Sequence, residues 1–143
     1  MLNNARIKNL FKTEITAYAH CDIPCGIYDP NDAIQAAKTV VRMTELLEEL
    51  DFSGGPSPKL GNSMARYVNA KEIHAKKAKD DVLVLWTDYF KPEHLSKYPD
   101  LHEKIWSACK LGSFVKVNVD LVKAKEFQSA LEEIGEIFWE TKK

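Results

Sequence analysis

A histidine and two cysteines that could bind a metal lie close together in the stretch His-Cys-Asp-Ile-Pro-Cys-Gly-Ile-Tyr, which begins at residue 20. His20 is adjacent to Cys21, and Cys25 follows four residues later. Pro24 and Gly26 favour a bend that lets both sulfur atoms face one point. Thiolates bind soft or borderline metal ions, and imidazole is a ligand for zinc, copper, iron and nickel. The stretch therefore has the residue types of a small metal site.

Three simple interpretations fit the same residues. A disulfide between Cys21 and Cys25 would close a very short loop, which is normally strained. The two cysteines could instead be inert residues of a turn. A zinc site would need a second pair of ligands, and His94 and His102 do not have a spacing common in zinc proteins.

A fourth interpretation requires the chain to begin at His20. Its free amine, the amide nitrogen and sulfur of Cys21, and the sulfur of Cys25 could then occupy the corners of a square. The imidazole of His20 could reach a fifth, axial position. Planar nitrogen and sulfur donors favour nickel or copper over zinc, which prefers a tetrahedron. Anionic donors also stabilise a higher oxidation state, so such a site could transfer one electron.

Residues 1–19 determine whether His20 can become a chain terminus. They end in Ala-Tyr-Ala, which resembles a cleavage site, but they lack the apolar block of about 7–15 residues found in secretory signals. They are either a terminal arm or a removable leader. Removal would take away three bases and one acid, which leaves 17 bases, 20 acids and a net charge of -3.

The composition bounds the class of protein. The chain has 143 residues, 45% of them hydrophobic and 29% charged, which suits one globular domain. Its 20 basic and 21 acidic residues argue against a broadly basic protein that binds nucleic acid. No stretch approaches the roughly 18 apolar residues of a membrane helix. Three cysteines are too few for a scaffold held by disulfides.

Apolar spacing between clusters of glycine and proline predicts four helices. The first is capped by Asn31 or Asp32, and the second is capped by Ser63 and runs towards Phe90. The third runs from Asp100 to Gly112, and the last carries an apolar stripe made of Ala124, Phe127, Leu131, Ile134 and Phe138.

Between the last two helices, Val115, Val117 and Val119 alternate with polar residues, which predicts an extended lead-in. The four helices must bury their apolar stripes against one another. We therefore expect an all-α fold, an antiparallel four-helix bundle over about residues 31–140, with the metal-binding hook of residues 20–28 at its amino-terminal end.

Residues 20–30 resemble the amino-terminal hook of the nickel superoxide dismutase family. Three more stretches resemble the same family: Val-Leu-Trp-Thr-Asp-Tyr-Phe-Lys-Pro at 84–92, Lys-Tyr-Pro at 97–99, and Ile-Phe-Trp-Glu-Thr-Lys-Lys at 137–143. The resemblance covers residues 20–143. It implies that residues 1–19 are a leader removed by a dedicated protease in the cytoplasm. It also implies a homohexamer with one nickel ion in each subunit.

The resemblance also implies roles for single residues. The nickel ion would be held by His20 through its amine and ring, by Cys21 through its amide nitrogen and sulfur, and by Cys25 through its sulfur. By cycling between divalent and trivalent states, it would convert superoxide into dioxygen and hydrogen peroxide. The family match further places Tyr28 beside the open face of the metal, gives Tyr89 a supporting hydrogen bond, and makes Lys91 the residue that attracts superoxide.

Two positions depart from the family pattern. Family members often place a glutamate and an arginine behind the axial imidazole, and the corresponding positions here are Ala36 and His74. Groups of this kind orient a metal-bound imidazole, so its support must be altered or rebuilt here. Cys109 lies outside the hook and is interpreted as a small apolar residue of its helix rather than a ligand.

Two other functions remain open at this point. The chain could be a carrier or sensor that holds a soft metal through Cys21 and Cys25, without catalysis and without cleavage of the leader. It could also be a helical interaction module in which the hook is a structural turn.

Overall fold

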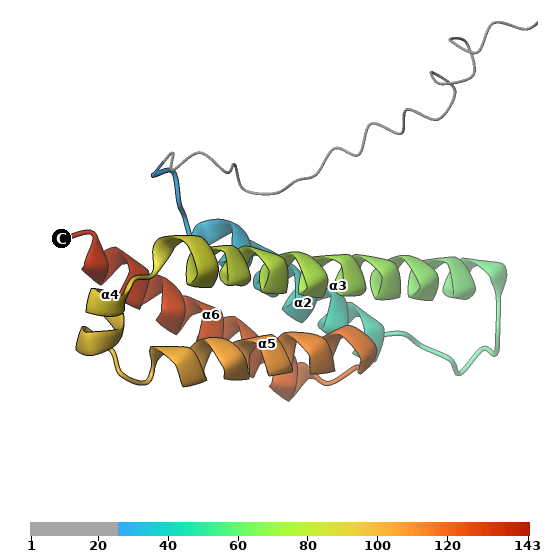
Figure 1. Ribbon diagram of the computed structural model, residues 1–143. Helices are drawn as coiled ribbons and strands as arrows, with labels where there is room; N and C mark the ends of the chain where they lie inside the picture. The colour runs from blue at the N-terminus through green and yellow to red at the C-terminus, as the bar shows by residue number, and fades with distance from the viewer. Residues whose placement is uncertain (1–25) are drawn as a thin grey trace, which may run out of the picture.

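Every regular element in residues 26–143, the part of the chain that the computed structural model describes, is a helix (Figure 1). The elements are α2 (Asn31–Glu48), α3 (Pro58–Val84), the π-helix η1 (Leu85–Tyr89), α4 (Pro92–Lys97), α5 (Leu101–Val117) and α6 (Leu121–Thr141). The prediction of an all-α fold is confirmed. None of the described helices is both long enough and apolar enough to span a bilayer.

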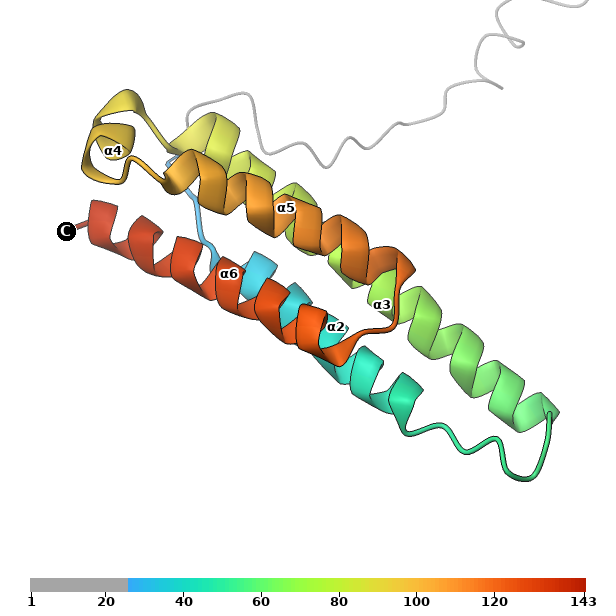
Figure 2. The ribbon, with the colours of Figure 1, turned by 90° about the horizontal axis from the view of Figure 1, so that it is seen from below.

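The four long helices form an antiparallel bundle (Figures 1 and 2). α2 packs against α3 and α6, and α5 packs against the same two helices. Each long helix therefore lies beside the long helices that precede and follow it along the chain. The loop between α2 and α3 lies at one end, and α4, the carboxyl terminus and the segment that enters α2 lie at the other (Figure 1).

The core forms where the apolar stripe of α6 meets small residues of the other helices. All five residues of the predicted stripe are buried: Ala124, Phe127, Leu131, Ile134 and Phe138. Alanines supply much of the facing surface, at Ala33, Ala36 and Ala37 of α2, Ala75 and Ala78 of α3, and Ala108 of α5. Small residues let helix backbones approach closely, and the aromatic rings of α6 fill the remaining space.

The expectation of an extended segment at residues 115–119 is wrong for residues 115–117, because α5 continues to Val117, although Asn118 and Asp120 are extended. Val115 is buried and extends the helical spacing of the preceding core residues. Gly112 lies inside the helix instead of ending it. A Cβ atom there would lie 3.1 Å from the ring of Phe127, so the glycine allows α6 to approach. Tertiary packing has overruled the local preference of valine for strands.

A buried lysine caps the carboxyl end of α5. Lys71 of α3 is 2% exposed, and its Nζ donates hydrogen bonds to the carbonyl oxygens of Val115 (2.6 Å), Lys116 (2.8 Å) and Asn118 (2.9 Å). Burial lowers the pKa of the Lys71 amine. The last carbonyl groups of a helix have no partner within the helix and carry partial negative charge, so a buried cation here stabilises the end of α5.

The starts of two helices, α2 and α3, and the presence of a third helix, α4, also differ from the sequence-based expectation. α2 has Pro30 at its cap position, although Asn31 or Asp32 was expected there. α3 begins at Pro58 instead of following Ser63, since Ser57 Oγ accepts the Leu60 amide hydrogen at 3.2 Å. Proline suits the first helical turn, where its missing N–H is not needed. The short helix α4 was not predicted, because its residues belong to a stretch bounded by prolines.

Candidate functional site

The described chain begins at the root of the hook. The three predicted nickel ligands, His20, Cys21 and Cys25, lie outside the described residues. Gly26 has a φ of 69°, a left-handed conformation that glycine adopts without steric cost. Asp29 Oδ1 accepts the Asn31 amide hydrogen at 2.8 Å, which directs the chain into α2.

The root of the hook is held against α6. Pro30 is buried, and a Cβ atom on Gly135 of α6 would lie 3.5 Å from the Pro30 Cβ and 2.9 Å from the Ile34 Cδ1. A side chain at Gly135 would therefore require the tip of the Ile34 side chain to move, whereas Pro30 lies at ordinary van der Waals distance. The root of the hook thus packs closely against α6 at this glycine.

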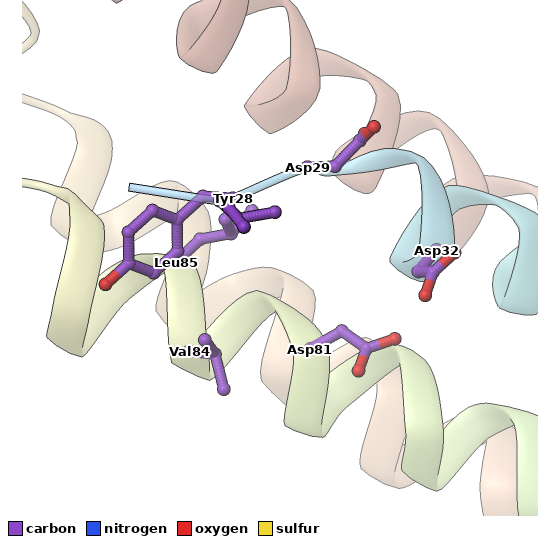
Figure 3. A pocket seen from close by; sticks show the side chains of 7 residues that line it. Tyr28, Asp29, Asp32, Asp81, Val84 and Leu85 are labelled. Atoms are coloured by element: carbon purple, nitrogen blue, oxygen red, sulfur yellow. The ribbon is translucent and has the colours of Figure 1, made fainter. Parts of the chain in front are cut away.

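Tyr28 and Tyr89 lie in ring contact at this end of the bundle. Their ring centroids are 5.5 Å apart, with a tilt of 53° between the ring planes. Tyr28 is half-buried, and its ring lies alongside Leu85 (Figure 3). Tyr89 is the last residue of η1, in which the Phe90 N–H reaches back to the Leu85 carbonyl at 2.9 Å. Such wide turns occur frequently at functional sites.

The hydroxyl of Tyr89 donates a hydrogen bond into the end of α6. The Thr141 hydroxyl donates to the Phe138 carbonyl at 2.6 Å. A hydroxyl has one hydrogen, so in the 2.6 Å contact between Tyr89 and Thr141 the tyrosine is the donor. Thr141 therefore fixes the orientation of the Tyr89 ring from a position 52 residues further along the chain.

We expect Thr141→Val to lower the free energy of unfolding by about 1–2 kcal/mol, because it removes the acceptor of the Tyr89 hydroxyl. Urea denaturation of the wild type, Thr141→Val, Tyr89→Phe and the double variant measures the coupling between the two side chains. The Tyr89→Phe change is the matched control, because it removes the same bond from the other partner. Strictly additive losses would contradict the assigned bond.

Lys91 is connected to the same tyrosine through His94. The Lys91 side chain is exposed, and its backbone N–H donates to His94 Nδ1 at 3.1 Å. The His94 ring stacks on Tyr89, with centroids 5.6 Å apart and 22° between the planes. The structure therefore brings Tyr28 and Tyr89 together directly and attaches the backbone of Lys91 to that pair.

A pocket of about 330 Å³ opens beside Tyr28. Its lining consists of Ile27, Tyr28, Asp29, Asp32, Asp81, Val84 and Leu85 (Figure 3). Lys77 forms ion pairs with Asp32 at 3.6 Å and with Asp81. Burial opposes the charge of Lys77, but the hydrogen bond and the charge of Asp81 outweigh it and raise the pKa of the lysine. The pocket therefore carries a net negative charge, because three carboxylates and only one lysine lie at it.

Three further side chains lie around Tyr89: His94, which the sequence analysis considered only as a zinc ligand, and Thr141 and Lys142, which it gave no role. Lys142 Nζ lies 4.9 Å from the centroid of the Tyr89 ring and 5.4 Å from that of Phe138. The stretches at 84–92 and 137–143 do contain Tyr89, Thr141 and Lys142. The family motifs therefore pointed to these residues, but the sequence did not predict that Thr141 and Lys142 contact Tyr89 across the bundle.

The two positions that depart from the family pattern lie within the bundle. Ala36 is buried in the core, and its methyl side chain has no atom that could accept a hydrogen bond from an imidazole. The Nδ1–H of His74 donates to the Ala70 carbonyl of its own helix at 2.8 Å. Cys109 is half-buried and packs against the core, and burial raises the pKa of its thiol. Within residues 26–143, no group of three or more His, Cys, Asp or Glu side chains could hold a metal ion.

Comparison with known proteins gives one consistent family. The family model for nickel-containing superoxide dismutase matches residues 15–142. A superoxide dismutase [Ni] from Streptomyces coelicolor is 38% identical over 137 residues, covering 96% of this chain and 98% of the relative. The enzyme of the same name from Streptomyces seoulensis is 36% identical over 140 residues, with the same coverage.

Solved structures agree with these relatives. A native nickel superoxide dismutase structure superposes with a TM-score of 0.72 at 39% identity, covering 87% of this chain and 100% of the solved chain. An oxidised-state structure of a nickel-containing superoxide dismutase has the same TM-score at 36% identity, covering 86% of this chain and 98% of that one.

Proposed function

The chain belongs to the nickel-containing superoxide dismutase family, and we propose that the hook beginning at His20 holds its nickel ion. The protein is an enzyme that disproportionates superoxide into dioxygen and hydrogen peroxide. Two superoxide ions and two protons are consumed, and one molecule of each product is formed. Nickel supplies the one-electron chemistry by alternating between its divalent and trivalent states. The remaining question is how this particular chain holds the metal and admits the substrate.

The donor set of the hook fits nickel. His20 offers an amine and an imidazole, Cys21 an amide nitrogen and a thiolate, and Cys25 a second thiolate. Soft thiolates combined with planar nitrogen donors suit nickel better than zinc or magnesium. The observation that carries the proposal is the position of Tyr28. It follows Cys25 by three residues, its ring contacts that of Tyr89, and Pro30, two residues later, packs against α6.

The amine of His20 becomes available when residues 1–19 are removed. The match to each curated relative uses 96% of this chain and covers 98% of the relative. The match to a solved structure uses only 87% of this chain, yet it covers the whole of the solved chain. The uncovered share is about the length of residues 1–19. This supports a division into a leader, 1–19, and an enzyme domain, 20–143, with a dedicated protease as the partner that cleaves them.

Tyr28 and Tyr89 restrict access to the hook. Two half-buried rings in contact directly after the metal-binding residues would favour a small substrate over larger molecules. The Tyr89 hydroxyl donates its hydrogen bond to Thr141, which keeps the Tyr89 ring in place, whereas Tyr28 is itself the last residue of the hook. We assign Tyr28 to gating and proton supply, Tyr89 to supporting Tyr28, and Lys91 to attraction of superoxide.

The assembly and location of the protein extend the proposal. We infer a homohexamer, as the family resemblance implies, in which a neighbouring subunit would shield the thiolates of the hook from the peroxide product. We infer a cytoplasmic enzyme, as the family resemblance implies.

Intact mass and metal analysis of the protein purified from its native host test the proposal. We expect a chain that begins at His20 and carries about one nickel ion per subunit. The alternative of a metal carrier or sensor using Cys21 and Cys25 is not favoured by the family, and it would retain the leader. A functional protein that begins at Met1, or that is equally active without nickel, would overturn the proposal.

We expect Lys91→Glu to lower the second-order rate with superoxide by about two- to fivefold at low ionic strength, because it replaces an attracting charge with a repelling one. The salt dependence of the rate should weaken as well, since less attraction remains to be screened. Pulse radiolysis at several salt concentrations measures both quantities. The matched control is Lys110→Glu on the outer face of α5, which makes the same change of charge. Equal effects of the two changes would contradict a local role for Lys91.

A further inference from the structure

The pocket beside Tyr28 combines negative charge with an apolar lining. Asp29, Asp32 and Asp81 supply three carboxylates, and Lys77, which pairs with two of them, is the one cation, so the net charge is -2 (Figure 3). The Asp32 side chain is 82% exposed, so its carboxylate stays accessible although Lys77 lies 3.6 Å away. The other lining residues are apolar or aromatic: Ile27, Tyr28, Val84 and Leu85. Such a surface suits a segment that is both basic and apolar.

Residues 1–19, the proposed leader, have these complementary properties. Its three basic residues, Arg6, Lys8 and Lys12, are opposed by Glu14 alone, so its side chains carry a net charge of +2. Large apolar residues lie among the bases, at Ile7, Leu10 and Phe11. A segment of this composition can place cations on carboxylates and apolar side chains on an apolar lining at the same time.

The leader is joined to the chain close to this pocket. Ile27 is part of the lining, and Lys12 precedes it by 15 positions. A chain of that length spans at most roughly 50 Å when fully extended, so the pocket is within reach of the basic residues. A short tether between two binding partners gives an effective concentration of the order of millimolar, so even a weak attraction leads to docking.

A second acidic pocket shows why charge alone does not select the docking surface. It lies between α5 and α6, with a volume of about 270 Å³, and it too holds three carboxylates and one lysine: Asp100, Glu103, Glu133 and Lys104. Lys104 pairs with Asp100 at 2.6 Å and with Glu133 at 3.0 Å. Among the described residues that line it, Ala130 alone is apolar. The apolar residues of the leader therefore favour the pocket beside Tyr28.

We propose that the leader, until it is removed, docks on the pocket beside Tyr28 of its own chain. Its basic residues lie on the carboxylates, and its apolar residues lie on Val84 and Leu85. Because Tyr28 lines this pocket and is also the last residue of the hook, the docked leader occupies the space beside the hook, and its removal vacates that space. This inference rests on the proposed division of the chain at His20.

Carbodiimide cross-linking of the unprocessed, full-length chain tests the docking. The reagent joins a lysine amine to a carboxylate that it contacts, and mass spectrometry identifies both residues. We expect cross-links from Lys8 and Lys12 of the leader to Asp29 and Asp81 at ~0.01 M ionic strength. Their yield should fall severalfold at about 1 M, where the Debye length is roughly 3 Å and the attraction is screened.

Two charge reversals make the test specific for this pocket. Asp32→Lys changes the net charge of the pocket from -2 to 0 and should lower the yield of leader cross-links at Asp29 and Asp81 about three- to tenfold at low ionic strength. Glu103→Lys is the matched control, because both acids are exposed, lie in the first turn of a helix and line a pocket of the same charge. This control should keep the yield of the unchanged chain. Urea denaturation midpoints confirm that all chains compared are folded.

Three results would overturn the docking. The first is the absence of leader cross-links at both Asp29 and Asp81, and the second is an equal yield in the Asp32→Lys and Glu103→Lys chains. The third comes from mixing chains of natural nitrogen with chains that carry the heavy isotope, which shows whether a cross-link joins one chain or two. Leader cross-links that join only different chains would contradict docking within a chain.

The intact mass of the protein from its native host separates this inference from the division on which it rests. If that protein begins at His20 and the unprocessed chain gives no leader cross-links, the proposed function stands and only the docking fails. If the functional protein begins at Met1, the division of the chain is wrong, whatever cross-links are found.

Discussion

A mature chain that carries one additional alanine before His20 should lose its superoxide dismutase activity by at least about a hundredfold, since even changes outside the ligand set of a metal commonly cost ~10–100-fold. The extension moves the amine away from the imidazole and replaces it with an amide. The ring of His20 and both cysteine sulfurs remain, so the variant isolates the chain terminus as a ligand. Residues 20–25 of the wild type are otherwise unchanged.

The measurement combines rate, nickel content and thermal unfolding. The matched control is a mature chain lengthened by one glycine after Gly54, in the loop between α2 and α3 at the far end of the bundle (Figure 1). This control should keep its nickel and its activity, whereas the extended hook should lose activity with the helical bundle intact. Wild-type activity in the extended chain would show that the amine of His20 is not a ligand.

The second large effect concerns stability. Lys71→Met should lower the free energy of unfolding by about 2–3 kcal/mol, because three carbonyl oxygens at the end of α5 lose their donor at once. Removing a buried charge gives back part of its desolvation free energy, which acts in the opposite direction. Water can reach the carbonyl oxygens of Lys116 and Asn118, which are only partly buried, but not that of the buried Val115. The lost hydrogen bonds therefore outweigh the desolvation free energy that is regained.

Lys79→Met is the matched control for this change. Lys79 also lies on α3 and reaches α5, where its Nζ donates to Ser113 Oγ at 2.9 Å, but this bond is exposed. Its loss should change the free energy of unfolding by about 0.5 kcal/mol or less. Urea denaturation at one fixed protein concentration compares both variants with the wild type, since self-association adds to apparent stability. A Lys71→Met protein as stable as the wild type would contradict the capping role.

The sequence alone predicted the features that depend on local pattern. The spacing of Ala124, Phe127 and Leu131 predicted the buried face of α6, because helical periodicity follows directly from backbone geometry. The four-helix bundle followed, since four apolar stripes of similar length can be buried only against one another. The residue types of the hook, at His20, Cys21 and Cys25, indicated soft-metal chemistry, and these three ligands stay a prediction.

The features that could not be predicted depend on residues far apart in the chain. α5 extends through Gly112 because Phe127 of α6 packs there, and it ends where Lys71 of α3 meets its carbonyl groups. Tyr89 and Thr141 were both within recognised stretches, yet their hydrogen bond joins residues 52 positions apart. No local pattern encodes such contacts, because they arise only when the bundle has formed.

The wide turn at Leu85–Tyr89 limits how this chain can change in length during evolution. Deleting one residue there would restore ordinary helical pairing and shift the residues that follow the deletion, up to the end of η1 at Tyr89, by about 100° around the helix axis. Tyr89 would leave the ring of Tyr28, and α4 would be redirected with it. The loop between α2 and α3 has no such role, because it lies at the end of the bundle opposite the start of α2 (Figure 1). We therefore expect a change in length to disturb the site more in the wide turn than in that loop.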